Sequence, residues 1–184
     1  MIRIKEKDDE REMKMIELHE NGLDIQFRIR ENGVVELADF SSQEVKKAPM
    51  EPKEDICYPA VEIHRSGTGS LNMHAYKNNI NQSSVDFVYE NHELKAQDGG
   101  KELEIVMVSP EKLKAVYHMR LFDGVPAVQT WTEIINEGSE EQGLTYVSSF
   151  MYQGISRGGE KPYYKKTDIY VPFNSWCCEA QWQK

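Results

Sequence analysis

The sequence is short of cysteines, of long apolar runs and of clustered basic residues, and each shortage disfavours a class of protein. Three of its 184 residues are cysteine, and an odd number without a framework of spacings fits a reducing cytoplasm better than a secreted, disulfide-bonded fold. No apolar run approaches the roughly 20 residues that a membrane-spanning helix needs, and the charged start MIRIKEKDDEREMKM has no apolar core of a signal peptide. The formal net charge of -9 disfavours nucleic acid and anionic membranes as partners, because both attract clustered Lys and Arg. We therefore expect a cytoplasmic protein with neither kind of partner.

Sequence motifs for metals, nucleotides and serine nucleophiles are missing as well. Cys57, Cys177 and Cys178 show no Cys-x-x-Cys spacing, and no His-x-x-x-His is present, so a zinc site is not indicated. No glycine-rich stretch matches a phosphate-binding loop, and Ser148-Ser149 lacks the Gly-x-Ser-x-Gly elbow of serine hydrolases. We expect no metal and no cofactor, and we expect the cysteines to behave as small, buried or part-buried apolar residues.

Helical periodicity is equally scarce, whereas strand patterns follow one another along the chain. In the stretch 23–30 apolar and polar residues alternate strictly, which is typical of a strand with one buried face. Turns rich in Asn and Gly at 19–22 and 31–33 join it to strands at 13–18 and 34–40, which predicts an antiparallel meander. Further strands are expected at 58–65, 85–94, 101–108, 113–122, 144–152 and 167–172, with long loops at 41–55 and 66–84. This succession of strands and turns predicts a single all-β domain over residues 1–184, an antiparallel β-sandwich.

The longest strand pattern is FDGVPAVQTWTEIINEG, residues 122–138. Asp123-Gly124 supplies turn chemistry at its start. Both of its alternating faces carry apolar residues, with Trp131 on one and Ile134 on the other. A strand that is partly apolar on both faces usually lies inside a two-layer structure. We therefore expect this stretch to form the central strand.

Four titratable side chains are candidates for chemistry. His64 and His74 flank the polar loop and would serve as acid–base or ligand groups. Glu62 and Glu133 lie on predicted strands, where a buried carboxylate with a raised pKa acts as a general base. The plainer interpretation is a histidine satisfied within the core and a carboxylate that is solvated or ion-paired.

Four aromatic residues near the C-terminal end are candidates for stacking on sugar rings, with core packing as the alternative. They lie in sequence that we expect to be irregular: Tyr163, Tyr164, Trp176 and Trp182.

Four stretches, in order along the chain, point to one family. They are YPAVEI (58–63), FDGVPAVQTWTEIINEG (122–138), LTYVSSF (144–150) and VPFNSWCCEAQW (171–182). Together they resemble the N-terminal domain of glycoside hydrolase family 36, mainly bacterial and fungal α-galactosidases, over nearly the whole chain. The resemblance implies a galactose mutarotase-like antiparallel β-supersandwich. It also implies a parent enzyme that forms homo-oligomers and hydrolyses terminal α-galactosides of the melibiose or raffinose type with retention.

The family's catalytic residues have no counterpart in this sequence. In the family, catalysis belongs to a following (β/α)₈ barrel whose aspartate nucleophile lies in a Lys-Trp-Asp motif. The three tryptophans here are followed by Thr, Cys and Gln, so the carboxylate pair of glycoside hydrolysis cannot be assigned. We therefore expect a non-catalytic domain that is cut short on its C-terminal side and lacks the barrel.

The resemblance implies one sugar-contacting residue, Asp55. Many family members carry a Gly-Asp-aromatic-Arg-Ser-Pro-Ala loop whose aspartate reaches the galactose site, often in a neighbouring subunit. The corresponding residues here are Glu54-Asp55-Ile56-Cys57-Tyr58-Pro59-Ala60. Asp55 keeps the carboxylate, Glu54 replaces the Gly, and Cys57 stands where the Arg would be. A charged carboxylate accepts strong hydrogen bonds from sugar hydroxyls; the alternative is a solvated loop carboxylate.

Two other functions stay open. A stand-alone carbohydrate-binding module would use exposed aromatic residues and the polar loop 66–84. A mutarotase-like enzyme would use His64 or His74 as the acid and a glutamate as the base. The hypothesis of an α-galactosidase domain accounts for the motifs and the missing nucleophile together.

Overall fold

The computed structural model describes residues 14–42, 57–69, 82–152, 165, 168, 170–175 and 178–183. The described residues fall into two compact units, one that includes residues 14–42, 57–69 and 82–152 and one that includes those from 165 onward. Each unit is considered by itself. The described residues are strand or irregular apart from the short helix α1 and a helical turn at Lys165, so the predicted all-β sandwich is confirmed. The galactose mutarotase-like subtype, the single domain and its shortened C-terminal side stay predictions. No described helix has the length and apolar character to cross a membrane.

The first sheet is the predicted meander. Strands β1 (Lys14–Glu20), β2 (Leu23–Ile29) and β3 (Val35–Ser42) pair antiparallel in the order β1-β2-β3. Asn21 and Gly22 form the two-residue turn between β1 and β2, both with positive φ (52° and 80°), as this type of hairpin requires. The alternation predicted for β2 holds, because Ile25 and Phe27 are fully buried.

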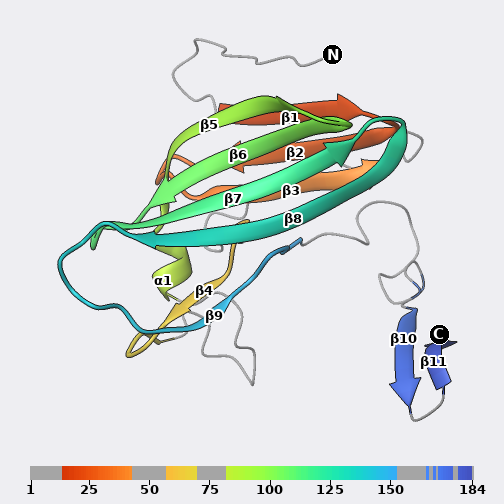
Figure 1. Cartoon of the computed structure of the whole chain (residues 1–184). Coiled ribbons are helices and arrows are strands. Elements are labelled where there is room, and N and C mark those ends of the chain that lie inside the picture. Colours follow the sequence, from red (N-terminus) through yellow and green to blue (C-terminus); the bar gives the residue numbers. More distant parts are fainter. Residues whose placement is uncertain are drawn as a thin grey trace. The chain divides into compact units, whose positions relative to one another are not determined.

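The second sheet packs over the first and encloses the core with it. Its strands β5 (Val88–Gln97), β6 (Gly100–Val108), β7 (Leu113–Phe122) and β8 (Val125–Asn136) are antiparallel in the order β5-β6-β7-β8. Figure 1 shows this sheet lying over β1–β3. Phe27 from the first sheet meets Tyr117 from the second edge to face, with ring centroids 5.7 Å apart. Such contacts make one apolar core between the two layers.

The position of β8 corrects one prediction. The stretch expected to be the central strand is the edge of the four-stranded sheet in the described part of the chain. Its inward Val128 and Ile134 pack against the core, whereas its outward Trp131 stacks on His118 of β7. Each face therefore has its own reason to carry apolar residues, and the two-sided pattern does not require a central position.

A small two-stranded sheet and one helical turn lie beside an end of the sandwich (Figure 1). Strand β4 (Ile63–Arg65) pairs antiparallel with β9 (Leu144–Val147). Both are shorter than predicted, since the flanking described residues make isolated backbone contacts such as the hydrogen bond from Ala60 N to Val35 O (2.7 Å). The end of the expected loop 66–84 forms α1 (Gln82–Val85), whose two serines are buried. Their hydroxyl groups bind the backbone of β4, which stabilises a helical turn that the sequence pattern does not show.

The second unit contains one antiparallel hairpin. Strands β10 (Val171–Ser175) and β11 (Cys178–Gln183) pair, with Pro172 opposite Trp182. Trp182 therefore lies on a strand, which corrects the expectation of irregular sequence there. Trp176, Tyr163 and Tyr164 lie outside the described residues.

Two hairpin turns of different sheets are joined by one side chain. The Asn21 amide group donates to Phe122 O (2.7 Å) and accepts from Gly124 N (3.1 Å). An ion pair between Glu20 of β1 and Lys101 of β6 adds a second link between the same two sheets. The β1–β2 turn is thereby fixed to the β7–β8 turn.

Candidate functional site

The outer face of the four-stranded sheet carries a group of polar side chains. On β6, Leu103 and Ile105 point into the core, so Glu102 and Glu104, which alternate with them, point outward. The register places Glu104 opposite His118 on β7, and His118 opposite Trp131 on β8. The period of two along each strand thus brings an acidic pair, an imidazole and an indole together on one face.

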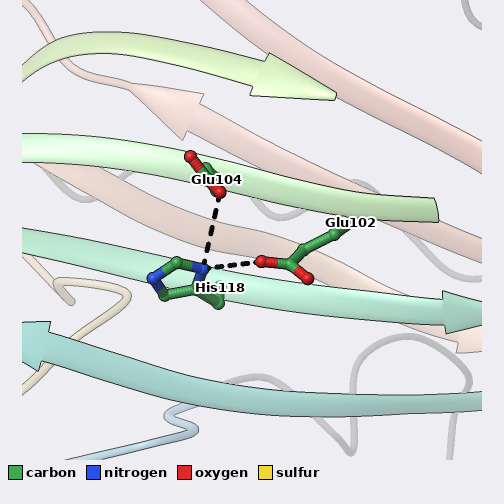
Figure 2. Close-up of side chains that lie close together, drawn as sticks. All are labelled: Glu102, Glu104 and His118. Atoms are coloured by element: carbon green, nitrogen blue, oxygen red, sulfur yellow. Dashed lines mark hydrogen bonds and ion pairs between the residues drawn. The ribbon is translucent and has the colours of Figure 1, made fainter. Parts of the chain in front are cut away.

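His118 is the centre of this group. Its Nδ1 lies 2.9 Å from Glu102 Oε1 and 3.9 Å from Glu104 Oε1, and Figure 2 shows both carboxylates directed at this nitrogen. Its Nε2 lies 3.8 Å from Glu133 Oε2 and makes no hydrogen bond within the described part of the chain. The residue is only 8% exposed. The Trp131 ring stacks on the imidazole, with centroids 4.6 Å apart and planes 5° from parallel.

Glu104 divides its two oxygens between two partners. Oε1 faces His118, whereas Oε2 accepts a hydrogen bond from Lys95 Nζ at 2.5 Å. This hydrogen bond to Glu104 raises the pKa of Lys95. One oxygen of Glu104 is thus neutralised by a cation, and the other is turned toward the imidazole.

The chemistry of the cluster is that of a cation ligand. Glu102, Glu104 and His118 each offer one ligand atom, and the three atoms lie within 4.8 Å of one another. Imidazole nitrogen and carboxylate oxygen are the donors that bind transition-metal ions such as Zn²⁺.

The predicted candidates Glu62 and His64 come together at a different place. His64 Nε2 lies 2.9 Å from Glu62 Oε1, and Glu62 is 4% exposed. The imidazole also lies against Tyr146, with ring centroids 5.1 Å apart. The third candidate, Glu133, belongs to the His118 group instead. His74 and the sugar-binding candidate Asp55 lie outside the described residues.

Three of the four sequence stretches that carry the family resemblance converge on Ser148. Glu62 N donates to Ser148 Oγ (2.8 Å), and Ser148 N donates to Glu62 O (2.9 Å). Thr132 Oγ1 of the long strand donates to Ser148 O (2.9 Å). Ser148 is 6% exposed. Its hydroxyl therefore positions backbone rather than serving as a nucleophile.

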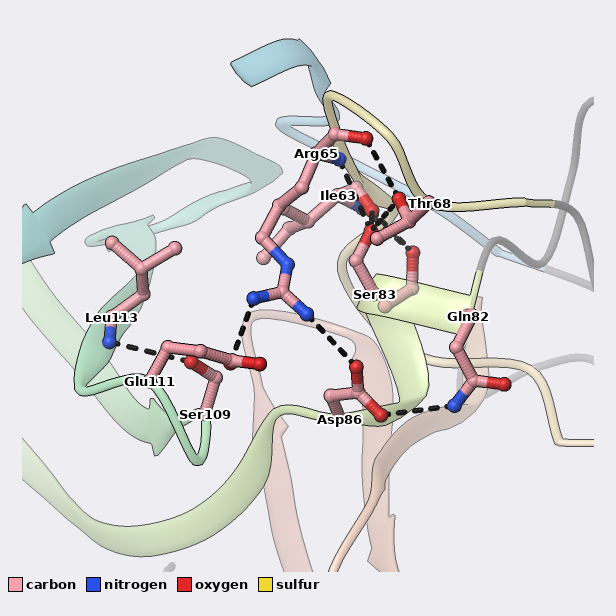
Figure 3. Close-up of polar contacts among 10 residues, drawn as sticks. Ile63, Arg65, Thr68, Gln82, Ser83, Asp86, Ser109, Glu111 and Leu113 are labelled. Carbon is pink, nitrogen blue, oxygen red and sulfur yellow. Dashed lines mark hydrogen bonds and ion pairs between the residues drawn. The ribbon is translucent and has the colours of Figure 1, made fainter. Parts of the chain in front are cut away.

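Arg65 fixes the small sheet to the rest of the first unit. Its guanidinium pairs with Asp86 at 3.0 Å and with Glu111 at 2.7 Å (Figure 3). Its backbone N donates to Ser83 Oγ (3.2 Å), and that hydroxyl in turn donates to Ile63 O (2.5 Å). These contacts join β4, α1 and the β6–β7 turn. The arrangement is structural, because each named group is engaged with another part of the chain.

Cys57 lies next to a buried carboxylate. Glu36 is 2% exposed and pairs with Arg28 at 3.4 Å and Arg30 at 3.1 Å. It also accepts a hydrogen bond from Tyr58 N (3.0 Å). Burial, and secondly the negative charge of Glu36, raise the pKa of the Cys57 thiol to about 12. The thiol is neutral and unreactive at physiological pH, in keeping with the structural role predicted for this cysteine.

The sequence alone does not reveal the His118 group, because His118 and Glu133 are far in sequence from the pair Glu102 and Glu104. Motif spacings find ligands that share a helix or a loop, whereas these residues come from three strands. The sequence signal that could reveal the group is the turn at Ser109-Pro110, which separates the strand patterns at 101–108 and 113–122. Once Val108 is paired with Lys114 across that turn, the register places Glu104 opposite His118.

Comparison with known proteins adds no identification. No protein-family model matches the sequence. A search of curated proteins found no match either. The indications of function are therefore the sequence resemblance and the geometry of the described residues.

Proposed function

We propose that the chain is the non-catalytic N-terminal β-sandwich domain of an α-galactosidase of glycoside hydrolase family 36. The parent enzyme hydrolyses terminal α-galactosides with retention, using a (β/α)₈ barrel. The sandwich domain supports assembly of the homo-oligomer and contributes to the rim of the galactose site, where Asp55 accepts hydrogen bonds from the sugar. The domain is cytoplasmic, which the neutral, free thiol of Cys57 supports.

The convergence on Ser148 carries this proposal. The stretches 58–63, 122–138 and 144–150 are separate in sequence, and each alone is a weak resemblance. In the structure they meet through hydrogen bonds to a single buried serine. Residues that resemble one family and that form one interlocked unit support a shared architecture better than scattered matches do. The antiparallel sandwich is also the fold that the resemblance implies.

A domain exchange tests the proposal. The N-terminal sandwich of a well-behaved family 36 α-galactosidase is replaced by this chain, and hydrolysis of p-nitrophenyl α-D-galactoside is measured. We expect the chimera to be soluble and active, and this chain alone to give no turnover. The control chimera carries an unrelated β-sandwich of similar length. Equal activity of the two chimeras, or none in either, would refute the proposal.

The same chimera tests Asp55. Asp55→Asn retains the shape of the side chain and removes its charge. If the carboxylate binds galactose, KM for the galactoside rises while the folding of the chimera is unchanged. A KM equal to that of the parent chimera would show that Asp55 is a solvated loop carboxylate.

A carbohydrate-binding module is the second candidate, and the exposure of two aromatic side chains favours it. Tyr146 is 51% exposed and Phe150 is 42% exposed, and sugars stack on exposed aromatic rings. Titration of this chain with melibiose, followed by NMR, separates the two candidates. Saturable shifts that Tyr146→Ala removes would favour the module, and the absence of shifts would favour the accessory domain.

A further inference from the structure

We infer that Glu102, Glu104 and His118 bind a divalent transition-metal ion, Zn²⁺ by preference, on the outer face of the four-stranded sheet. The ion is held by Glu102 Oε1, Glu104 Oε1 and His118 Nδ1 and joins β6 to β7. This inference does not depend on the proposed function, since it uses only the geometry of the cluster.

The ligand atoms lie near the distances that a metal requires. Donor atoms about 2.1 Å from a tetrahedral ion are about 3.4 Å from one another. His118 Nδ1 is 2.9 Å from one carboxylate oxygen and 3.9 Å from the other, so the observed distances lie on either side of this value. Small rotations of the two glutamate side chains would make them equal, without movement of the sheet.

The other nitrogen of His118 supplies the second observation. A metal-binding histidine usually donates its second ring N–H to a carboxylate, a backbone carbonyl or a water molecule, which fixes its tautomer and orientation. Nε2 of His118 is buried, makes no hydrogen bond within the described residues and is 3.8 Å from Glu133 Oε2. A proton on Nε2, the ring nitrogen on the side of Glu133, would leave the lone pair of Nδ1 for the ion. The Trp131 ring, parallel to the imidazole, holds its plane in place.

The donor set selects the class of ion. One imidazole and two carboxylates suit Zn²⁺, whereas Mg²⁺ and Ca²⁺ prefer sites made of oxygen alone. Three carboxylates surround the imidazole, and the ammonium of Lys95 is bound to the oxygen of Glu104 that faces away from it. A divalent cation would offset the remaining negative charge.

The pair of Glu62 and His64 provides a matched control inside the same molecule. Its imidazole and carboxylate are also 2.9 Å apart, as are those of His118 and Glu102. Only the His118 group adds a second carboxylate as a metal ligand among the described residues. A histidine–glutamate contact alone is therefore tested separately from the three-ligand cluster.

Isothermal titration of the untagged chain with Zn²⁺ measures the site, and the absorption of bound Co²⁺ reports its coordination. The experiment uses Cys177→Ser/Cys178→Ser as background, so that zinc bound by thiols does not contribute. We expect one equivalent of Zn²⁺ to bind, with Mg²⁺ giving no signal. His118→Gln and Glu102→Gln are expected to lose binding, and Glu133→Gln to weaken it about 10- to 100-fold. His64→Gln is expected to bind as the background protein does.

Two results would overturn the inference. One is the absence of Zn²⁺ binding by the background protein. The other is an affinity that is the same in His118→Gln and in the background, which would place the ion elsewhere. Far-UV circular dichroism confirms that each variant is folded. If His118→Gln fails to fold, the thermal midpoint of the background protein decides the matter, because a bound ion must raise it and Glu102→Gln must abolish the rise.

Discussion

Gly100 begins β6 two residues before Glu102, and its replacement by alanine is expected to separate β6 from β7 locally. A Cβ atom on Gly100 would lie 1.9 Å from the carbonyl oxygen of Leu121 and 3.2 Å from Cα of Phe122. Both contacts are with backbone of the neighbouring strand, so no side-chain rotation relieves them. The preceding residue, Gly99, offers the matched comparison. A Cβ there meets nothing within 4 Å, although φ is +72°.

The two alanine substitutions are therefore expected to lower the free energy of unfolding by different amounts. Gly99→Ala incurs only the left-handed backbone strain of about 1–2 kcal/mol, partly offset by about 0.4–1 kcal/mol from a less flexible unfolded chain. Gly100→Ala must displace the end of β7, where residue 100 pairs with Phe122 and residue 101 with Leu121. The loss of about two backbone hydrogen bonds costs roughly 1 kcal/mol each, and overpacking costs about 1–3 kcal/mol. Together they lower the free energy of unfolding by about 3 kcal/mol or more.

Thermal unfolding followed by circular dichroism measures the difference. For a chain of this size, 1 kcal/mol lowers Tm by about 2–4 °C. We expect Gly100→Ala to lower Tm by about 6–12 °C and Gly99→Ala by about 0–6 °C. If the loss at Gly100 were no larger than the loss at Gly99, the close approach of β6 and β7 at this point would be wrong.

Two further predictions concern titratable groups. The pKa of Cys57 is raised from 9.0 to about 12, which makes its thiolate about 1000-fold scarcer at pH 8. Alkylation by iodoacetamide, measured by mass spectrometry of the Cys57 peptide, is therefore expected to be about 1000-fold slower in the native chain than in the urea-unfolded chain. Native and unfolded rates within tenfold of each other would contradict the burial of the thiol. The pKa of His92 is lowered from 6.5 by burial and secondly by the charge of Lys14. As the pH falls below 6.5, His92 therefore binds a proton in the unfolded chain before it does so in the folded chain. The free energy of unfolding is expected to fall as the pH falls from that value. Lys14→Met is expected to raise the midpoint of the His92 titration measured by NMR, and an unchanged midpoint would show that the Lys14 charge does not act on His92.

Local chemistry determines the parts of the fold that the sequence predicts well. The alternation over 23–30 and the Asn-Gly turn before it depend on a few neighbouring residues, so the meander and its buried face follow from pattern alone. The helical turn α1 does not, because the backbone of β4, about twenty residues earlier, stabilises it through Ser83 and Ser84. The edge position of β8 could not be predicted from alternation either, since alternation shows which residues share a face but not which strands lie on either side.

The candidate site shows the same division. Its acidic pair is visible as Glu102-x-Glu104 on a predicted strand, but an acidic pair on an outward face has no special meaning by itself. The pair becomes a candidate site only because His118 lies beside it. The register of three strands brings His118 within 4 Å of Glu102, Glu104 and Glu133. Glu62 and His64, in contrast, are two residues apart on the same segment, and their contact could be anticipated from spacing. Asp55 remains a prediction from resemblance.

The double role of Asn21 limits which residue can occupy a hairpin turn. Positive φ is tolerated best by glycine and next by Asn or Asp, so turn chemistry alone would favour glycine at this position. A glycine, however, can neither donate to Phe122 O nor accept from Gly124 N through a side chain, and an aspartate can only accept. Asparagine alone among these three residues meets both demands. Because this amide joins the tips of two hairpins from opposite layers, the layers are expected to open as one cooperative unit, with amide hydrogens of β2 and β7 exchanging with solvent at a common free energy.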